Sequence, residues 1–298
     1  MAVASGAAKS IQRGWTLSLT GSGHLFVYHL GASQRLLDVP TQSSHPTTNV
    51  HHVVGTSGGA IAAAIVASGI SIPDYAQAFI EQRGRGLHLL EEFWKNHESS
   101  SPRKRNDIGL HIATTRCEDG ASKVFSYDNI HKTLNNNDDK QQLLECIRAS
   151  CLIPPTFHPL DILSSTKSYP DQEGIPLEDP LTGLNFYVDG GIATPAPMVF
   201  PDHEEDEGDG SVQHTTRVIV SPIAGTCKET ARISPAMSKG WWPHIHVPHD
   251  MGIQLSWSNL RALSMATGNV TSTELQNWYQ RGQDDAGYFV ESLESLCE

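Results

Sequence analysis

The chain has 298 residues, of which 38% are hydrophobic and 18% are charged. This composition excludes a mainly disordered protein, which would be poorer in apolar residues and richer in charge. The longest nearly uncharged apolar stretch, residues 60–72, is shorter than the about 20 residues that cross a bilayer. No transmembrane segment is therefore expected.

The net charge of −12 comes from 21 Lys and Arg against 33 Asp and Glu, so a nucleic-acid partner is not expected. The basic cluster at 103–105 is interpreted as a solvated loop. Any membrane contact is expected to be local and apolar. The five cysteines form no C-x-x-C pair, and residues 1–15 contain no signal-peptide core, which predicts reduced thiols and a cytoplasmic protein. A transit peptide at the N-terminus stays open as an alternative.

Apolar periodicity and turn residues predict strands that alternate with helices in the first half of the chain. The expected strands cover 15–19, 50–54, 107–116, 121–126, 185–188 and 217–220. The expected helices cover 25–37, 60–68, 73–83, 87–95, 127–134, 140–150, 256–267 and 272–293. The acidic run 203–210 is expected to be a solvated loop, and the chain after about 225 to be loop-rich. This alternation predicts an α/β fold with a parallel sheet.

The sequence Gly55-Thr56-Ser57-Gly58-Gly59 fits the G-x-S-x-G pattern between a β-branched strand and an Ala-rich helix. Such a turn holds the serine in a strained conformation with its hydroxyl exposed, and small residues are needed two positions before and after it. The alternative is a glycine turn with no chemical role. The strand and helix around the motif favour a nucleophilic serine.

The earlier turn Gly21-Ser22-Gly23 also joins a predicted strand to a helix. Its backbone N–H groups suit either a phosphate loop or an oxyanion hole. No Walker lysine follows, and Phe26 breaks the dinucleotide pattern G-x-G-x-x-G, so the oxyanion hole is favoured. A third motif, Asp189-Gly190-Gly191, follows a predicted strand, where an aspartate can be exposed in a cleft. The alternative interpretation of that motif is a polar turn.

In this order, the three motifs resemble the patatin-like phospholipase family, with most similarity to the branch of adipose triglyceride lipase and adiponutrin. Similar strings lie at 19–23, 27–31, 149–155, 187–192, 220–225, 259–264 and 279–282. The resemblance implies a three-layer α/β sandwich with a mostly parallel central sheet and helices on both faces. It also implies a catalytic domain over 15–200. Residues 201–298 would add the acidic loop, a further strand and helices that pack on the same core.

The resemblance further implies a serine esterase or lipase in which Ser57 is the nucleophile and Asp189 the general base. The oxyanion would be stabilised by backbone N–H groups of Gly21, Ser22, Gly23 and Gly58. The remaining motif glycines are Gly55, Gly59, Gly190 and Gly191. No metal or other cofactor is implied. The substrate would be an acylglycerol or phospholipid at the surface of a lipid droplet or membrane, while its lipid class, its acyl position and a protein activator stay open.

Two alternatives remain for the function. An α/β-hydrolase triad could draw its histidine from those that follow Asp189, namely His203, His214, His244, His246 and His249. Against this, Ser57 follows only two predicted strands, whereas that fold places several before its nucleophile. The other alternative is a non-catalytic lipid-binding or regulatory protein, which is favoured by Phe26 at a position where the family usually keeps a glycine.

The cluster Trp241-Trp242-Pro243, with Ile245 and Val247, has two interpretations. Tryptophan suits the interface between water and lipid, which makes the cluster a candidate for membrane contact. The alternative is packing in the core of the C-terminal segment. The nearby His244, His246 and His249 could indicate zinc, but no matching set of cysteines or carboxylates accompanies them.

Overall fold

The computed structural model describes residues 15–39, 50–82, 85–97, 108–157, 168–179, 181–197, 216–227, 230–247, 251–268 and 270–295. Its main sheet contains β1 (Trp15–Leu19), β2 (Val50–Gly55), β3 (Gly109–Arg116), β4 (Ser122–Tyr127), β5 (Ile175–Asp179), β6 (Gly183–Asp189), β7 (Thr216–Val220) and β9 (Ala231–Ile233). A smaller sheet contains β8 (Gly225–Cys227), β10 (His244–Val247) and β11 (Met251–Gln254).

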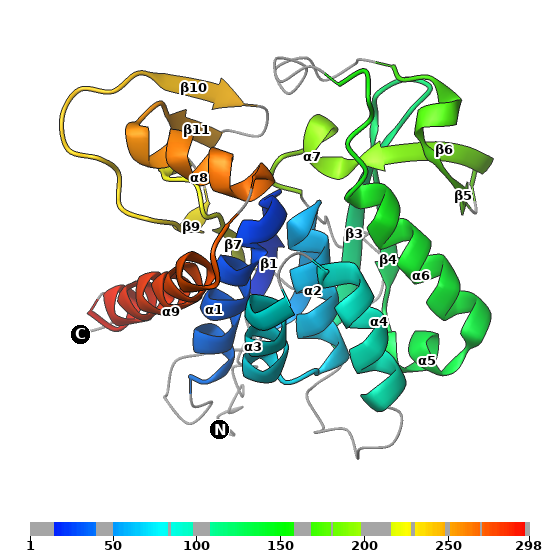
Figure 1. Cartoon of the computed structure of the whole chain (residues 1–298), viewed down its shortest axis with the longest axis horizontal. Helices are drawn as coiled ribbons and strands as arrows, with labels where there is room; N and C mark the ends of the chain where they lie inside the picture. The colour runs from blue at the N-terminus through cyan, green and yellow to red at the C-terminus, as the bar shows by residue number, and fades with distance from the viewer. Residues whose placement is uncertain are drawn as a thin grey trace, which may run out of the picture.

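The helices flank these sheets (Figure 1). They are η1 (Gly23–Leu25), α1 (Phe26–Leu37), α2 (Gly58–Ser68), α3 (Ile72–Gln82), α4 (Gly86–His97), α5 (Ile130–Asn135), α6 (Asn137–Ser150), η3 (Asp171–Glu173), α7 (Gly190–Ala193), α8 (Trp257–Thr267) and α9 (Ser272–Ser295). None of the helices in the described ranges has the length and apolar character that a membrane span needs.

The main sheet has the order β5-β6-β3-β2-β1-β7-β9, with β4 paired to β3. Strands β3, β2, β1, β7 and β9 are parallel, while β4, β5 and β6 are antiparallel to their neighbours. The expected α/β class with a mostly parallel central sheet is confirmed. The parallel order arises because helices connect successive strands in the first half of the chain.

Several expected boundaries are wrong. Tyr127 ends strand β4 and does not begin a helix, and α5 starts at Ile130. The strand β5 was not expected, nor were β8, β9, β10 and β11 in the segment that was expected to be loop-rich. These strands have three to five residues, which is too short for apolar alternation to identify them.

Several sequence predictions fall outside the described residues. They concern the basic cluster 103–105, the acidic run 203–210, the boundary at 200, and His203, His214 and His249. The division into a catalytic domain and a C-terminal extension therefore stays a prediction. The four cysteines that the structure describes carry free thiols, as expected.

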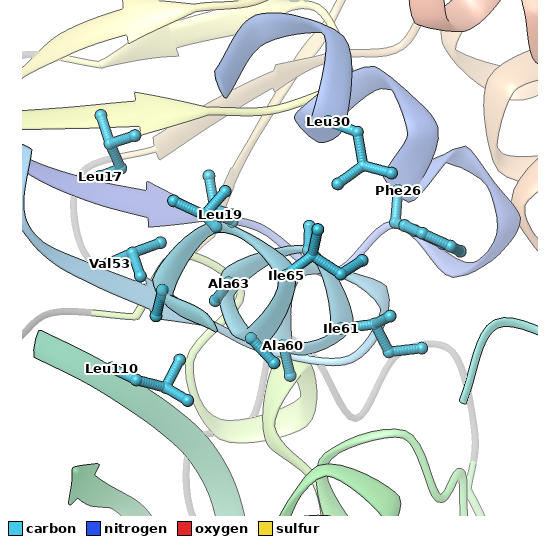
Figure 2. Close-up of a cluster of buried hydrophobic side chains, with 14 of the residues drawn as sticks. Leu17, Leu19, Phe26, Leu30, Val53, Ala60, Ile61, Ala63, Ile65 and Leu110 are labelled. Carbon is cyan, nitrogen blue, oxygen red and sulfur yellow. The ribbon is translucent and has the colours of Figure 1, made fainter. Parts of the chain in front are cut away.

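Helix α2 lies at the centre of the core, and every residue from Gly58 to Ser68 is buried. Figure 2 shows Ala60 and Ala63 of this helix close to Val53 and Leu110, which lie on the neighbouring strands β2 and β3. Alanine side chains let a helix approach a sheet closely without leaving a cavity. The Ala-rich sequence of α2 therefore fixes the start of this helix directly above the carboxyl end of β2.

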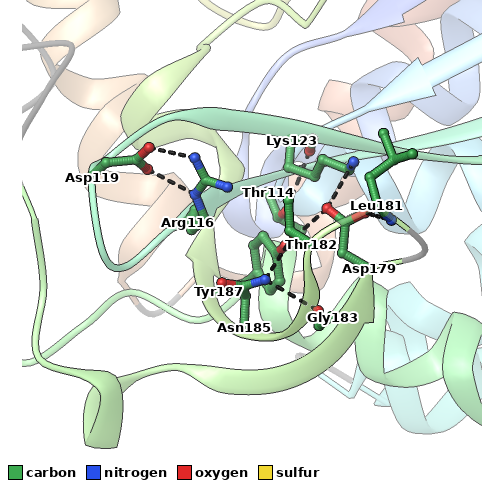
Figure 3. Close-up of polar contacts among 10 residues, drawn as sticks. All are labelled: Thr114, Arg116, Asp119, Lys123, Asp179, Leu181, Thr182, Gly183, Asn185 and Tyr187. Carbon is green, nitrogen blue, oxygen red and sulfur yellow. Dashed lines mark hydrogen bonds and ion pairs between the residues drawn. The ribbon is translucent and has the colours of Figure 1, made fainter.

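An ion pair between the partly exposed Lys123 and the buried Asp179 ties β4 to the end of β5 (Figure 3). Lys123 Nζ lies 2.8 Å from Asp179 Oδ2, and the backbone N–H of Leu181 donates to Asp179 Oδ1 over 2.9 Å. Burial alone would raise the pKa of Asp179. Lys123 and the Leu181 N–H outweigh that effect and lower the pKa to about 2. The carboxylate thus stays charged and holds the hairpin that leads into β6.

The long helix α9 crosses α1 at two glycines, which let the two backbones touch. A Cβ on Gly282 would lie 2.2 Å from the Tyr28 carbonyl oxygen, and one on Gly31 would lie 2.0 Å from the Tyr279 carbonyl oxygen. Next to this crossing, the Tyr28 hydroxyl donates to Asp285 Oδ2 over 2.7 Å. The C-terminal helix is therefore packed directly onto the first helix of the chain.

We expect Gly282→Ala to lower the free energy of unfolding by about 3 kcal/mol, because the added methyl group collides with backbone that cannot move aside. Gly287→Ala is the matched control in the same helix, since its Cβ would lie 3.5 Å from Arg35 Nε in ordinary contact. The control should be neutral or up to about 1 kcal/mol more stable. Urea unfolding of the two variants measures both values, and equal stabilities would contradict the close crossing.

Candidate active site

Ser57 sits in a strained turn between β2 and α2. Its φ of 54° and ψ of −131° make it the one non-glycine residue with a positive φ in the described ranges. The turn brings Gly55 against Gly59, where a Cβ on Gly55 would lie 2.1 Å from the Gly59 carbonyl oxygen. This is the geometry expected of a G-x-S-x-G motif, and it leaves Ser57 partly exposed.

Ser150 holds this turn in place. Its Oγ accepts a hydrogen bond from the Ser57 backbone N–H over 2.9 Å and donates to the Ala113 carbonyl oxygen over 2.7 Å. Ser150 is fully buried at the end of α6. Sequence reasoning noted the string 149–155 but assigned no role to this serine. Because its hydroxyl takes the Ser57 N–H, that N–H is not among the candidate oxyanion donors.

The pairing of β3 brings Asp189 to Ser57. Gly55, at the end of β2, pairs with Ile112, and Asp189, at the end of β6, pairs with Thr114 two residues farther along β3. Since β2 is parallel to β3 and β6 is antiparallel to it, the carboxyl ends of β2 and β6 meet. Sequence reasoning placed both residues at strand ends, and the register of β3 joins them.

The backbone of Asp189 is fixed on both sides. Its N–H donates to the Leu152 carbonyl oxygen over 2.8 Å, and its own carbonyl oxygen accepts from Thr115 Oγ1 over 2.7 Å. The same Thr115 Oγ1 accepts from the Ala193 N–H over 3.1 Å. The aspartate is therefore held by β3, by the segment after α6 and by the short helix α7. The role of Thr115 carries no signal in the sequence.

The carboxylate of Asp189 is buried, with 5% of the residue exposed. It accepts a hydrogen bond from the Gly191 N–H over 2.7 Å, and the Ser57 hydroxyl lies close enough to lower its pKa. Burial raises its pKa to about 6, because the Ser57 hydroxyl and the Gly191 N–H offset only part of the cost of desolvating the charge. A carboxylate with this pKa accepts a proton near neutral pH far better than an ordinary aspartate.

The glycine-rich turn lies against this pair. A Cβ on Gly21 would lie 3.6 Å from the Ser57 Cβ, and one on Gly58 would lie 2.5 Å from the Gly23 carbonyl oxygen. Behind the turn, the buried His29 lies with Nε2 2.9 Å from the Thr20 carbonyl oxygen, and burial lowers the pKa of its imidazole to about 4. A neutral His29 thus donates to the turn and supports it.

The N–H groups around the turn divide into two sets. Those of Thr20 and Thr56 donate to the carbonyl oxygens of Val220 and Leu19, each over 3.2 Å, so they belong to the sheet. The contacts of Gly21 with Ser57 and of Gly58 with Ser22 and Gly23 bring the expected oxyanion residues together, and their role as donors stays a prediction: Gly21, Ser22, Gly23 and Gly58.

Phe26 does not enter this turn. Its ring is 2% exposed and packs on Phe79 of α3, with ring centroids 4.5 Å apart, and on Tyr75 at 6.4 Å. The bulk that replaces the usual glycine is thus absorbed by the core between α1 and α3. Phe26, the residue that favoured a non-catalytic protein, therefore points into the core and does not occupy the glycine turn.

The histidines of the triad alternative are placed differently. His244 and His246 lie on β10 in the smaller sheet, and both are exposed. The titratable group beside the Ser57 hydroxyl is instead the Asp189 carboxylate, whose pKa that hydroxyl lowers. Among the residues that the structure describes, no group of three or more His, Cys, Asp or Glu side chains could hold a metal ion.

Comparisons with known proteins agree with the motifs. The family model "Patatin-like phospholipase" matches residues 17–200. The human "Omega-hydroxyceramide transacylase" is 22% identical over 302 residues, covering 94% of this chain and 46% of that protein. The human "1-acylglycerol-3-phosphate O-acyltransferase PNPLA3" is 24% identical over 313 residues, covering 96% of this chain and 52% of that protein.

A third relative is the human "Patatin-like phospholipase domain-containing protein 2". It is 26% identical over 211 residues, which covers 63% of this chain and 34% of that protein. The chain thus spans about half, or less, of the length of these curated relatives.

The buried charge of Asp189 predicts an unusual effect on stability. Because the folded state raises the pKa of Asp189, its ionised form costs the folded chain free energy above about pH 6. The difference from the ordinary value of 3.8 corresponds to about 3 kcal/mol. This cost disappears as the pH falls through 6 towards 3.8. We therefore expect Asp189→Asn to be more stable than the wild type at pH 8 and to lose that advantage by about pH 4.

Thermal unfolding of the wild type and of Asp189→Asn across this pH range measures their difference in stability. The titration of other groups largely cancels in that difference. Asp179→Asn is the control, because that buried carboxylate has its pKa lowered to about 2 and should be stabilising when charged. The control variant is expected to be less stable than the wild type at pH 8. A difference between Asp189→Asn and the wild type that does not change with pH would contradict a raised pKa at Asp189.

Proposed function

The chain belongs to the patatin-like phospholipase family, and on this premise we propose that it hydrolyses carboxylic esters of acylglycerols, as a triacylglycerol lipase or a phospholipase. The observation that carries the proposal is the position of Ser57 beside the buried Asp189 carboxylate, where the ends of β2 and β6 meet on β3 and the serine hydroxyl lowers the pKa of the carboxylate. This pair lies beside a glycine turn and at the start of α2, where backbone N–H groups favour a developing negative charge.

In the proposed acylation step, Ser57 Oγ attacks the ester carbonyl carbon while Asp189 takes the hydroxyl proton. The negative charge moves to the carbonyl oxygen, which accepts hydrogen bonds from the N–H groups of the turn 21–23 and of Gly58. The tetrahedral intermediate then collapses, the bond to the alcohol breaks, and Asp189 returns the proton to the leaving alkoxide. The products are an acyl-enzyme at Ser57 and a free alcohol.

Deacylation uses the same groups in reverse. Water attacks the acyl carbonyl carbon, Asp189 accepts its proton, and the bond to Ser57 Oγ breaks as that proton passes to the serine. A fatty acid leaves and the starting enzyme returns. A pKa near 6 suits both directions, because Asp189 must accept and release a proton at neutral pH.

A second candidate is transfer of the acyl group to an alcohol. The names of two relatives describe a transacylase and an O-acyltransferase. The same acyl-enzyme serves both reactions, since an alcohol can replace water as the attacking group. We propose peripheral association with lipid droplets or membranes for either reaction, because the acyl donor resides there.

Ser57→Ala tests the proposal. The variant should lose at least 99% of the hydrolysis of a chromogenic short-chain ester, because no nucleophile remains, while its far-UV circular dichroism is unchanged. The exposed Ser122→Ala is the control and should keep full activity. Lipid-class profiling of the products, with and without an added alcohol, then identifies the acyl donor and acceptor.

Two further arms separate the dyad from its alternatives. Activity should survive EDTA, and it should survive His244→Ala and His246→Ala. A loss in either histidine variant as deep as that of Ser57→Ala would replace the dyad with a triad. Activity retained by Ser57→Ala above a few per cent would refute the nucleophile assignment.

A further inference from the structure

Five large apolar side chains are exposed on α8 and on the segment before β10. The exposed fractions are 89% for Trp241 and 75% for Trp257, and nearly half for the three others. The set, here named the tryptophan patch, comprises Met237, Trp241, Trp257, Leu260 and Leu263. The two interpretations of the sequence cluster 241–247 thus divide: Trp241 is not packed in the core, whereas Ile245 packs against the small cluster of Ala196, Ile219 and Met251.

Hydrogen bonds join the two segments of the patch. Ser238 Oγ lies 3.3 Å from Ser258 Oγ. Met237 directly precedes the first of these serines, and Trp257 directly precedes the second. The Leu255 N–H donates to the Pro243 carbonyl oxygen over 2.8 Å, which ties the chain after Trp241 to the start of α8. The patch is thus one surface built from two segments.

The opposite face of α8 is anchored. Asn259 Oδ1 accepts from the Ala224 N–H over 2.8 Å, and Nδ2 donates to the carbonyl oxygens of Ala224 and Gln254, each over 2.7 Å. Ala262 on the same face is 1% exposed. The helix is therefore held rigidly by its buried side, and Trp257, Leu260 and Leu263 face outward on a fixed support.

The carboxyl end of α8 touches the candidate oxyanion turn. A Cβ on Gly23 would lie 2.1 Å from the Ala266 carbonyl oxygen, and His24 Nδ1 lies 3.2 Å from the Gly268 carbonyl oxygen. Figure 1 shows α8 and β10 at the same end of the molecule as the carboxyl end of β1. The patch is therefore carried by a helix whose carboxyl end contacts the glycine turn beside Ser57.

The charge around the patch differs from that of the whole chain. Residues 231–268 contain three Lys and Arg and one carboxylate, whereas the whole chain has 21 against 33; of the three, Arg232 is largely buried and donates to the Ile223 carbonyl oxygen, which leaves Lys239 and Arg261 at the surface. Lys239 is exposed between Met237 and Trp241, and Arg261, which follows Leu260, is 75% exposed in its side chain and pairs with Glu274 over 3.4 Å. An anionic surface would thus attract this side of the molecule and repel the acidic remainder.

We propose that the tryptophan patch docks the protein onto a phospholipid bilayer that contains anionic lipid, with the site of Ser57 turned towards it. Indole rings favour the depth of the lipid headgroups, the aliphatic side chains enter the acyl region, and Lys239 and Arg261 meet lipid phosphates. This docking rests on the proposed function, because it supplies the face through which a lipid ester would reach Ser57.

The test measures binding without catalysis. The parent protein carries Ser57→Ala, and the patch variant carries Trp241→Ala and Trp257→Ala in addition. Each is sedimented with vesicles of phosphatidylcholine that contain one quarter phosphatidylglycerol. We expect the double change to weaken partitioning about tenfold or more. Tyr288→Ala with Leu181→Ser is the matched control, since these side chains are 71% and 86% exposed on other elements, and it should bind as the parent does. Binding should also fall when phosphatidylglycerol is omitted.

Three results would overturn the docking: no binding by the parent, equal binding by the patch variant and its control, or a dimer that the patch changes dissociate in analytical ultracentrifugation. The last would make the patch an interface between two copies. Because the parent carries Ser57→Ala, vesicle binding does not depend on esterase activity. An inactive wild type that still binds vesicles would therefore refute the proposed function and leave the docking intact.

Discussion

The contact between Ser57 and Asp189 depends on one constraint, the pairing of two opposed strands with the same strand β3. Strand β2 arrives parallel to β3 and ends at Gly55, and β6 arrives antiparallel and ends at Asp189. Their ends meet across two residues of β3. The Lys123–Asp179 ion pair upstream of β6 and the Thr115 hydrogen bond at its end hold this register. A shift of β6 by one residue would turn the carboxylate to the other face of the sheet.

The same arrangement places energetic costs where the chemistry needs them. Ser57 is held at a positive φ, a strain of about 1–3 kcal/mol, and Asp189 is charged in a buried site. Both are offset by the apolar core around α2 and by Ser150, which occupies the N–H of the strained serine. An exposed aspartate would be a weaker base by about two powers of ten at equal geometry, so burial is the property that would let the proposed serine–aspartate pair act without an imidazole.

The sequence predicted what local pattern encodes. G-x-S-x-G and its flanks located Ser57, and Asp-Gly-Gly at a strand end located Asp189, although their contact needs the register of β3. The role of Ser150 could not be predicted, because its two partners, Ser57 and Ala113, are distant in the chain. The smaller sheet was missed because strands of three or four residues carry no measurable period. Trp241 was ambiguous because an apolar side chain has the same pattern whether it is buried or meets a lipid surface.

The most direct test of the account is the pH dependence of covalent labelling by a fluorophosphonate, which reacts with an activated serine hydroxyl and releases fluoride. Peptide mass spectrometry locates the adduct, and the second-order rate is measured from pH 5 to 8 on wild type and Asp189→Asn, with circular dichroism at each pH. The account predicts an adduct on Ser57, a rate that rises with a midpoint near pH 6, and a loss of about 100-fold or more in Asp189→Asn. An adduct on another serine, or labelling of folded Asp189→Asn at the wild-type rate, would contradict it.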